Sequence, residues 1–362
     1  MTAIRSSRLR RALERLHAYD FGPPAGRAVV QLASNEGTFG PMAAAREAMA
    51  QLGAHANRYP DSGCTKLRDA LARRHGVSVE QIVVGAGSES IVNYLSMALL
   101  EPDDEVAHCN PTFPAYRTCA LKMGARAVTA PLKDGDYDLA ALLGVITDRT
   151  KIAYLANPNN PTGAMIGRGD LARFLARLPA HVLPVIDEAY HEYVEEPDYA
   201  DPIREHVVDG RQVMVLRTFS KIYGLAGLRV GYAIAPPEIA EACVKVRNAF
   251  DVGLLAQGMA LASLDCDAEL AERRRFTRRR RESLRDGLLT LGYAPKQSVA
   301  NFVYFRANGA ADVARALLER GVLVRNLAGF GDPDALRVTV GTDDENLAFL
   351  EALRGLARAT CR

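Results

Sequence analysis

Short apolar runs alternate with amphipathic segments from about residue 81 to residue 236. The runs are rich in β-branched residues, as buried strands are, whereas the segments between them carry apolar residues at helical spacing. We expect strands at 81–84, 105–107, 127–129, 151–156, 182–187 and 213–218, with helices beginning near Ser88, Pro114, Leu139, Asp170 and Ile203. Such alternation predicts an α/β fold with a mostly parallel sheet covered by helices on both faces, that is, three layers.

The pattern differs at the two ends of the chain. Before residue 81 we expect helices at 7–17, 42–52 and 65–75 and a short strand at 29–33. After Pro236-Pro237 long helices continue to residue 291. Strands at 301–306, 322–325 and 336–340 then alternate with helices at 311–320 and 344–358. This last block predicts a smaller α+β C-terminal domain.

Composition narrows the class of protein. A chain of 362 residues with 48% hydrophobic residues can bury a large core and divide into two domains. A net charge of +2 gives no sign of a global nucleic-acid footprint. Six scattered cysteines, no membrane-length apolar run and no secretory signal predict a cytoplasmic protein with reduced thiols, and neither the cysteines nor the histidines show metal-ligand spacing.

The most informative stretch surrounds Lys221. An apolar run leads into Thr218 and Ser220, and a glycine-rich loop then connects Lys221 to Arg229. A strand end is a rigid place from which to present an amine, and a neutral lysine amine forms imines with carbonyl compounds. Hydroxyl groups and an arginine nearby suit a phosphate ester. A cofactor with both an aldehyde and a phosphate, pyridoxal phosphate, fits this set. A lysine alone in such a place is more often a surface residue at a strand-to-loop junction.

Two further strand ends carry polar groups. The run 152–156 ends in Asn157-Pro-Asn-Asn160-Pro-Thr-Gly163, and the run 182–186 ends in Asp187, with Tyr190 three residues later. A buried aspartate is costly without a cation, and a protonated pyridine nitrogen is such a cation. The simpler alternatives are a turn rich in asparagine and an aspartate that caps the next helix.

The stretch Gly85-Ala-Gly87-Ser88-Glu89-Ser90 follows the first of these strands. It predicts an anion site at the start of a helix, because the first backbone N–H groups of a helix lack partners. The same stretch supports a remote alternative, a dinucleotide-binding enzyme. Its third glycine is missing, however, because position 90 is serine.

Together these stretches resemble the fold-type I pyridoxal-phosphate enzymes, and within them the histidinol-phosphate aminotransferase family. The resemblance rests on Asn157–Gly163, Asp187-Glu-Ala-Tyr190, Thr218-x-Ser-Lys221, Leu225-Ala-Gly-Leu-Arg229 and Leu336-Arg-Val-Thr-Val-Gly-Thr342, and it covers nearly the whole chain. It implies an N-terminal arm (1–41) that packs with the small domain and the partner subunit, a large cofactor-binding domain (42–240), and connecting helices with a small C-terminal domain (241–362).

The resemblance implies roles for individual residues. Lys221 holds the cofactor as an imine and moves the proton, Asp187 keeps the pyridine nitrogen protonated, and Tyr190 and Asn160 bind the phenolic oxygen. Phe113 stacks on the ring. The phosphate is bound by the N–H groups of Ser88 and Glu89, by the side chains of Thr218, Ser220 and Arg229, and by Tyr59 of the partner subunit, which makes the enzyme a homodimer.

The resemblance also implies a substrate site made of Asn35, Asn160, Arg325 and Arg337, with Tyr19 reaching in from the partner. It implies transfer of an amino group from histidinol phosphate to 2-oxoglutarate, in histidine biosynthesis. An arginine side chain binds a carboxylate as readily as a phosphate, because its guanidinium group donates hydrogen bonds to both in the same way. Gly37-Thr38 and Asp251-Val-Gly253 also depart from the family pattern. An aromatic or specialised-metabolism amino acid therefore remains an alternative substrate. A non-catalytic regulator is a third hypothesis, which the short stretch before Tyr19 disfavours.

A dense basic run, Arg273-Arg-Arg-Phe-Thr-Arg-Arg-Arg-Arg281, lies in one of the predicted long helices. Basic runs can bind nucleic acid. Phe276 is the only aromatic residue in this one, and Glu269, Glu272 and Glu282 lie at helical spacing to pair with it. We expect a solvated helix face and no nucleic-acid partner.

Overall fold

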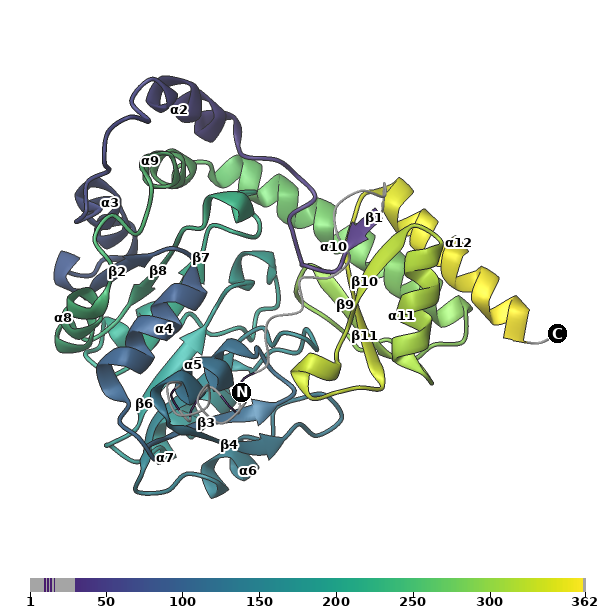
Figure 1. Cartoon of the computed structure of the whole chain (residues 1–362), viewed down its shortest axis with the longest axis horizontal. Coiled ribbons are helices and arrows are strands. Elements are labelled where there is room, and N and C mark those ends of the chain that lie inside the picture. The colour runs from purple at the N-terminus through teal and green to yellow at the C-terminus, as the bar shows by residue number, and fades with distance from the viewer. Residues whose placement is uncertain (1–9, 11, 13, 15, 17–29, 361–362) are drawn as a thin grey trace, which may run out of the picture.

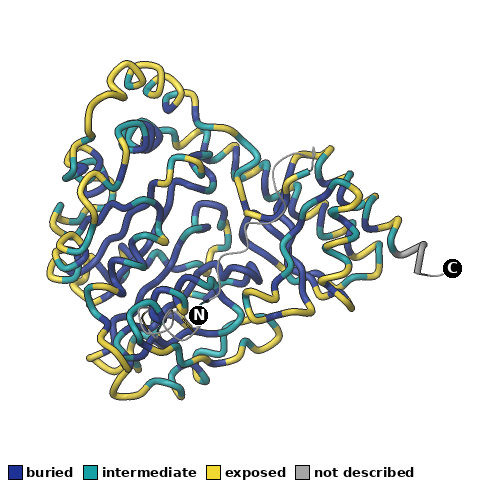
Figure 2. The backbone as a smooth tube through the Cα atoms, in the orientation of Figure 1, coloured by how far each residue is buried: buried dark blue, intermediate teal, exposed yellow. Residues whose placement is uncertain are grey.

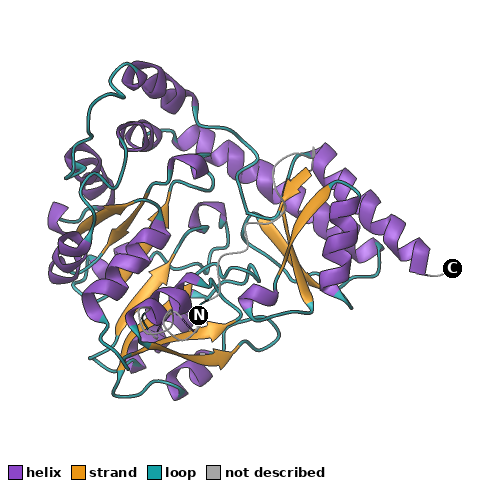
Figure 3. Ribbon diagram, in the orientation of Figure 1, coloured by secondary structure: helices purple, strands orange, loops and turns teal. Residues whose placement is uncertain are grey.

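A computed structural model describes residues 10, 12, 14, 16 and 30–360, without the side chains of 357–360. Within these residues the chain forms two sheets, and the predicted α/β fold is confirmed (Figures 1 and 3). Most of the predicted helix at 7–17 lies outside the described residues, as does Tyr19. In the part of the chain that the structure describes, no helix is long and apolar enough to cross a membrane.

The larger sheet has seven strands in the order β2-β8-β7-β6-β5-β3-β4. These are β2 (Ile82–Gly85), β8 (Gly231–Ile234), β7 (Met214–Thr218), β6 (Leu183–Asp187), β5 (Thr150–Ala156), β3 (Glu105–Asn110) and β4 (Arg126–Pro131). The strands from β7 to β4 are parallel, and β8 runs antiparallel to both of its neighbours. The mostly parallel sheet expected from the alternating pattern is therefore present.

Except at the edge strand β4, most residues of this sheet are buried, and Figure 2 draws them in dark blue. Along β5 alternate residues belong to different clusters, with Ile152 and Tyr154 on one face and Ala153 and Leu155 on the other. The first face packs against α4 (Ser88–Leu99), α5 (Ala115–Met123) and α8 (Pro237–Val246). The second packs against α3 (Thr65–His75), α6 (Leu139–Gly144), α7 (Arg168–Arg177) and α9 (Leu254–Ser263). Period-two alternation with apolar residues on both faces produces the three layers.

The smaller sheet has four strands in the order β1-β10-β11-β9. These are β1 (Val30–Leu32), β10 (Val322–Asn326), β11 (Ala335–Thr339) and β9 (Phe302–Arg306). Its apolar cluster includes residues of α10 (Asp267–Thr290), α11 (Ala310–Glu319) and α12 (Asp343–Thr360). β1 joins this sheet from the N-terminal end of the chain, and residues 33–42 lead from it to α2 (Ala43–Gly53) beside α9 (Figure 1). The domain boundaries at residues 41 and 240 stay a prediction.

The basic run of α10 corrects one expectation. Arg273 and Arg281 are buried, with exposed fractions of 4% and 6%, and each donates to backbone carbonyl groups. Arg275 and Arg279, by contrast, are exposed. The prediction of a solvated helix face is therefore wrong for part of the run, because one side of α10 is buried, with Leu270 in one apolar cluster and Leu284 and Leu288 in another.

Candidate active site

The carboxyl ends of β5, β6 and β7 bring the predicted site residues together. These strands are parallel neighbours, and Ala156 pairs in register with Asp187, which pairs with Leu216. The residues that follow each strand therefore meet at one edge of the sheet. Polar groups at this edge of an open α/β sheet commonly form a ligand site.

Asp187 is buried at this edge with an exposed fraction of 5%. The Tyr116 hydroxyl donates to its Oδ2 at 2.7 Å, and the Ala189 N–H donates to its Oδ1 at 3.1 Å. Burial raises the pKa of Asp187 to about 6, although the two hydrogen bonds and the charge of Lys221 oppose this shift. A carboxylate in such surroundings is stabilised by a cationic partner.

Lys221 lies in the same site. Its Nζ donates to the carbonyl of Ser34 at 3.3 Å and lies 5.6 Å from the centre of the Tyr190 ring. Tyr190 in turn accepts a hydrogen bond at 3.0 Å from the Nδ2 of Asn35. The predicted amine therefore lies near the predicted carboxylate and tyrosine, although Lys221 comes from a different segment of the chain from Asp187 and Tyr190.

A cradle for an anion forms at the start of α4. Gly87, with φ of 87°, precedes Ser88, the first residue of the helix. A Cβ atom at Gly87 would lie 2.6 Å from Nη2 of Arg229, so only glycine admits this guanidinium so close to the backbone. Arg229 also donates through Nη1 to the Ser220 hydroxyl at 3.3 Å.

The rest of this cradle comes from β7 and its neighbour. The Ser220 N–H donates to the Thr218 hydroxyl at 3.1 Å, so these two residues turn together toward α4. Glu89 and Arg229 also line a neighbouring hollow of about 360 Å³, which Thr218 and Ser220 do not line. A helix N-terminus, two hydroxyl groups and a guanidinium fit a phosphate group. The residues present therefore fit a cofactor that carries an aldehyde and a phosphate.

Two arginines lie beside Asn160. Arg337 donates to Asn160 Oδ1 through Nη1 and to the Ala33 carbonyl through Nη2, the latter at 2.7 Å. The Nε of Arg325 donates to the same carbonyl at 3.2 Å. Because Arg325 and Arg337 also pair in register across β10 and β11, the two guanidinium groups lie side by side.

Phe113 and Tyr59 have different surroundings. Phe113 is half-buried near this edge, and its ring centre lies 5.6 Å from that of Tyr116. Tyr59 is 82% exposed and stacks on Phe250 with ring centres 4.5 Å apart. An aromatic ring with this solvent exposure is available for contact with another molecule.

Tyr116 was not predicted as a site residue from the sequence. It donates to Asp187 from α5, although 71 residues separate the two in the chain. Its ring also stacks on Tyr154 at 4.3 Å, which fixes the direction of the hydroxyl. The signal that would have found it is its spacing, because it lies three residues after Phe113, in the first turn of the helix that follows.

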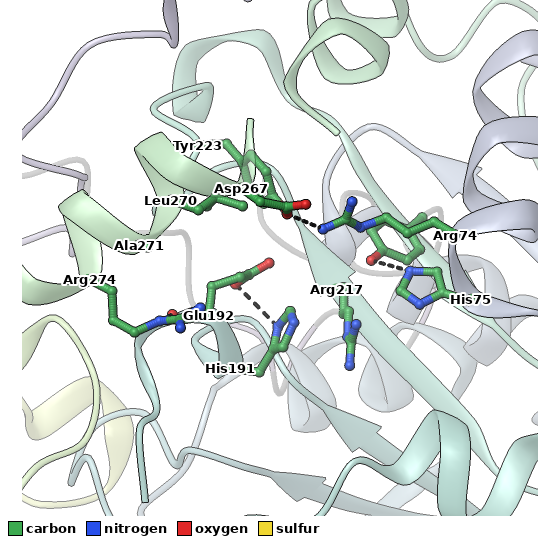
Figure 4. Close-up of a pocket in the computed structure, with 11 residues that line it drawn as sticks. Arg74, His75, His191, Glu192, Arg217, Tyr223, Asp267, Leu270, Ala271 and Arg274 are labelled. Carbon is green, nitrogen blue, oxygen red and sulfur yellow. Dashed lines mark hydrogen bonds and ion pairs between the residues drawn. The ribbon is translucent and has the colours of Figure 1, made fainter. Parts of the chain in front are cut away.

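A second cavity, of about 310 Å³, lies away from these residues, between α10, the end of α3 and β7 (Figure 4). None of the predicted site residues lines it. Arg217 of β7 does, whereas Thr218 points to the opposite side because side chains alternate along a strand. This cavity therefore belongs to the layer behind the site.

The polar groups of this second cavity partner one another. Arg74 pairs with Asp267 at 2.7 Å, His191 lies 3.2 Å from Glu192, and His75 shares a hydrogen bond of 3.0 Å with Tyr232. Burial lowers the pKa of His75 to about 3, so its imidazole is neutral. These pairs form a structural network beneath the site.

The dinucleotide alternative is not supported. The strand before Gly85-x-Gly87 is β2, which lies at the edge of the sheet and pairs antiparallel with β8. A dinucleotide fingerprint instead begins a parallel strand-helix-strand unit.

Comparison with known proteins identifies the family of this chain. Residues 27–353 match the family model described as aminotransferase class I and II. The chain is 42% identical over 351 residues to an aromatic amino acid aminotransferase of Thermobifida fusca, with 96% of each chain covered. It is 40% identical over 328 residues to a histidinol-phosphate aminotransferase of Moorella thermoacetica, with 90% of this chain and 85% of the relative covered.

A solved structure is similar throughout. Histidinol-phosphate aminotransferase from Sinorhizobium meliloti, in complex with pyridoxal-5'-phosphate, matches with a TM-score of 0.89 and 30% identity, covering 98% of each chain. The resemblance drawn from the sequence is therefore confirmed. The chain belongs to the class I and II aminotransferases and is a pyridoxal-phosphate-dependent enzyme that acts on amino and oxo acids.

Proposed function

We propose that this aminotransferase transfers the amino group of histidinol phosphate to 2-oxoglutarate, as a step of histidine biosynthesis in the cytoplasm. The observation that carries the proposal is the adjacency of Arg325 and Arg337, which both donate to the Ala33 carbonyl. Like charges opposite one another across two strands destabilise a sheet. A dianionic phosphate beside both guanidinium groups offsets that repulsion, and the carboxylate of glutamate uses the same pair.

In this proposal the chain's own residues hold the reacting groups. Pyridoxal phosphate supplies an electron sink for the electrons that remain when the substrate loses a proton. Lys221 binds the cofactor, and its Nζ takes and returns that proton. Asp187 holds a proton on the ring nitrogen, which suits a carboxylate buried with few other cations nearby.

The remaining proposed roles concern orientation. Tyr190 and Asn160 donate to the phenolic oxygen. Asn160 has its Nδ2 available for this because its Oδ1 already accepts from Arg337. Phe113 stacks on the ring, and Asn35 completes the substrate side. The phosphate is bound by Ser88, Glu89, Thr218, Ser220 and Arg229.

We also propose that the enzyme is a homodimer in which Tyr59 and Tyr19 reach the partner's site. Tyr59 supports this through its exposure of 82% and its stacking on Phe250, which holds an aromatic ring at the surface. Tyr19 lies outside the described residues. Residues 42–240 form the cofactor domain in this proposal, and the chain from 241 forms the connecting helices and the small domain.

An amino-donor panel tests the substrate. With 2-oxoglutarate as acceptor, kcat/KM for histidinol phosphate is expected to exceed that for phenylalanine or tyrosine by about 10-fold or more, because only the phosphate engages both arginines with two charges. Arg325→Gln should weaken histidinol phosphate more than phenylalanine. A preference for phenylalanine of the same size would overturn the proposal.

That outcome would favour the second candidate, an aromatic amino acid aminotransferase. The observation in its favour is the relative of that name from Thermobifida fusca, which is 42% identical across 96% of the chain. Identity to the histidinol-phosphate relative from Moorella thermoacetica is nearly the same, at 40%. Turnover therefore decides between the two substrates.

A further inference from the structure

Arg273 of α10 lies directly behind the loop that carries Lys221. Its Nη1 donates to the Ile222 carbonyl at 2.8 Å, and its Nη2 donates to the Gly40 carbonyl at 2.9 Å. Nη2 also pairs with Glu269 on the same helix at 2.5 Å. The side chain is 4% exposed, so these contacts are shielded from water.

The two carbonyl groups belong to segments that meet at the site. Ile222 follows Lys221, and Gly40 lies in residues 33–42, which we call the crossing segment because it leads from the small sheet to α2 (Figure 1). A Cβ atom at Gly37 would lie 2.6 Å from the Lys221 carbonyl, and one at Gly224 would clash with the Gly40 carbonyl. The two segments therefore touch backbone to backbone.

The other end of the crossing segment is held by the small sheet. The Asn35 N–H donates to the Thr339 hydroxyl at 2.9 Å, and the Thr38 hydroxyl donates to the Val340 carbonyl at 3.0 Å. Asn301 donates to the Asn35 carbonyl at 3.1 Å. Arg273 thus holds one end of a segment whose other end is hydrogen-bonded to β11 and the residue after it.

We propose that Arg273 is a positioning residue for the amine of Lys221. Its guanidinium group holds the Lys221 loop against the crossing segment. It thereby determines where Nζ of Lys221 lies relative to the Ser34 carbonyl and to the hydrogen-bonded pair Asn35–Tyr190. One planar guanidinium can donate to two carbonyl groups and a carboxylate at once, which a lysine ammonium on a flexible stem cannot do with the same geometry. The proposal rests on the role proposed for Lys221.

The test uses the cofactor-loaded enzyme with Arg273→Lys and Arg273→Gln. Exposed Arg275→Gln and Arg279→Gln, on the same helix, are matched controls. The pH midpoint of the visible absorbance of the bound cofactor is expected to move by about half a pH unit or more in both Arg273 variants, because Nζ changes its surroundings. Their kcat/KM should fall about 10–100-fold, mainly through kcat. The controls should leave both quantities unchanged.

Two outcomes would overturn the proposal. One is a folded Arg273 variant with an unchanged absorbance midpoint and kcat/KM within about twofold of the native enzyme. The other is a loss of thermal stability alone, with normal titration in the folded fraction. If Arg273→Gln fails to fold, Arg273→Lys decides, since it keeps the charge and most of the stem. A separate measurement tests the role of Lys221 itself. If the cofactor still binds covalently to the Lys221→Ala variant, that role is wrong, whatever the Arg273 variants show.

Discussion

Asp187, which we propose holds the proton of the ring nitrogen, destabilises the cofactor-free protein at neutral pH. Its carboxyl group is almost fully buried, and burial raises its pKa to about 6 from 3.8. Below pH 3.8 both the folded and the unfolded protein hold the proton, so the group costs nothing. Between pH 3.8 and 6 the unfolded protein has lost this proton but the folded protein keeps it, so the stability of the cofactor-free protein falls as the pH rises. Above about pH 6 the carboxyl group is ionised in both states and the loss of stability is complete.

The first prediction follows from this loss of stability with rising pH. Asp187→Asn should stabilise the cofactor-free protein at pH 8 by about 3 kcal/mol, and by about half of that at pH 5. The amide can still accept from Tyr116. Thermal unfolding at the two pH values measures the change, and Asp312→Asn, at a side chain 73% exposed, is the control. Equal pH dependence of the two variants would contradict the raised pKa. Aminotransferase activity of Asp187→Asn should fall even so.

At the scale of elements, β6 and β7 are joined by a buried ion pair next to the site. Arg217 donates to Glu188 Oε2 through Nε at 2.8 Å and Nη2 at 2.7 Å, and the Tyr199 hydroxyl donates to Oε1 at 2.7 Å. The Glu188 side chain is fully buried and that of Arg217 is 9% exposed. Because Glu188 follows Asp187 and Arg217 precedes Thr218, this pair supports two site residues from behind.

We predict that Arg217→Ala lowers the free energy of unfolding by about 3–5 kcal/mol, because it leaves the Glu188 charge buried without its partner. Chemical denaturation of the cofactor-free protein measures this. Arg315→Ala removes an exposed pair with Asp312 and should cost about 1 kcal/mol or less. The paired change Arg217→Met with Glu188→Gln should recover much of the loss. Similar costs for Arg217→Ala and Arg315→Ala would rule out a strongly buried pair.

At the scale of the whole molecule, the proposed dimer divides the active site between two chains. Lys221 and Asp187 act within one chain, whereas Tyr59 serves the partner. Defects in different chains can then complement one another, because a mixed dimer can hold one complete site.

Mixing Lys221→Ala with Tyr59→Ala, under conditions where subunits exchange, should therefore restore about a quarter of the native activity. Half of the dimers are mixed, and each has one complete site. Mixing Lys221→Ala with Asp187→Ala should restore nothing, since both residues serve the same site. If mixed dimers form without recovery of activity, Tyr59 does not act across the interface.

The sequence by itself determined what depends on local pattern. Strand ends at Asp187 and Thr218, the helix start at Ser88 and the lysine after β7 all follow from apolar runs and the residues that end them. The resemblance to aminotransferases added the cofactor. Each of these features lies within about 15 residues of chain, where periodicity and turn chemistry decide the structure.

Only the tertiary structure decided which distant residues meet. Tyr116 reaches Asp187 because α5 packs over the sheet, and Arg273 is buried because α10 passes behind the Lys221 loop. The basic run looked like a solvated face because sequence spacing cannot tell which side of a helix packs against other elements. Contacts between segments far apart in sequence depend on sheet order and helix packing, and local residue patterns do not contain that information.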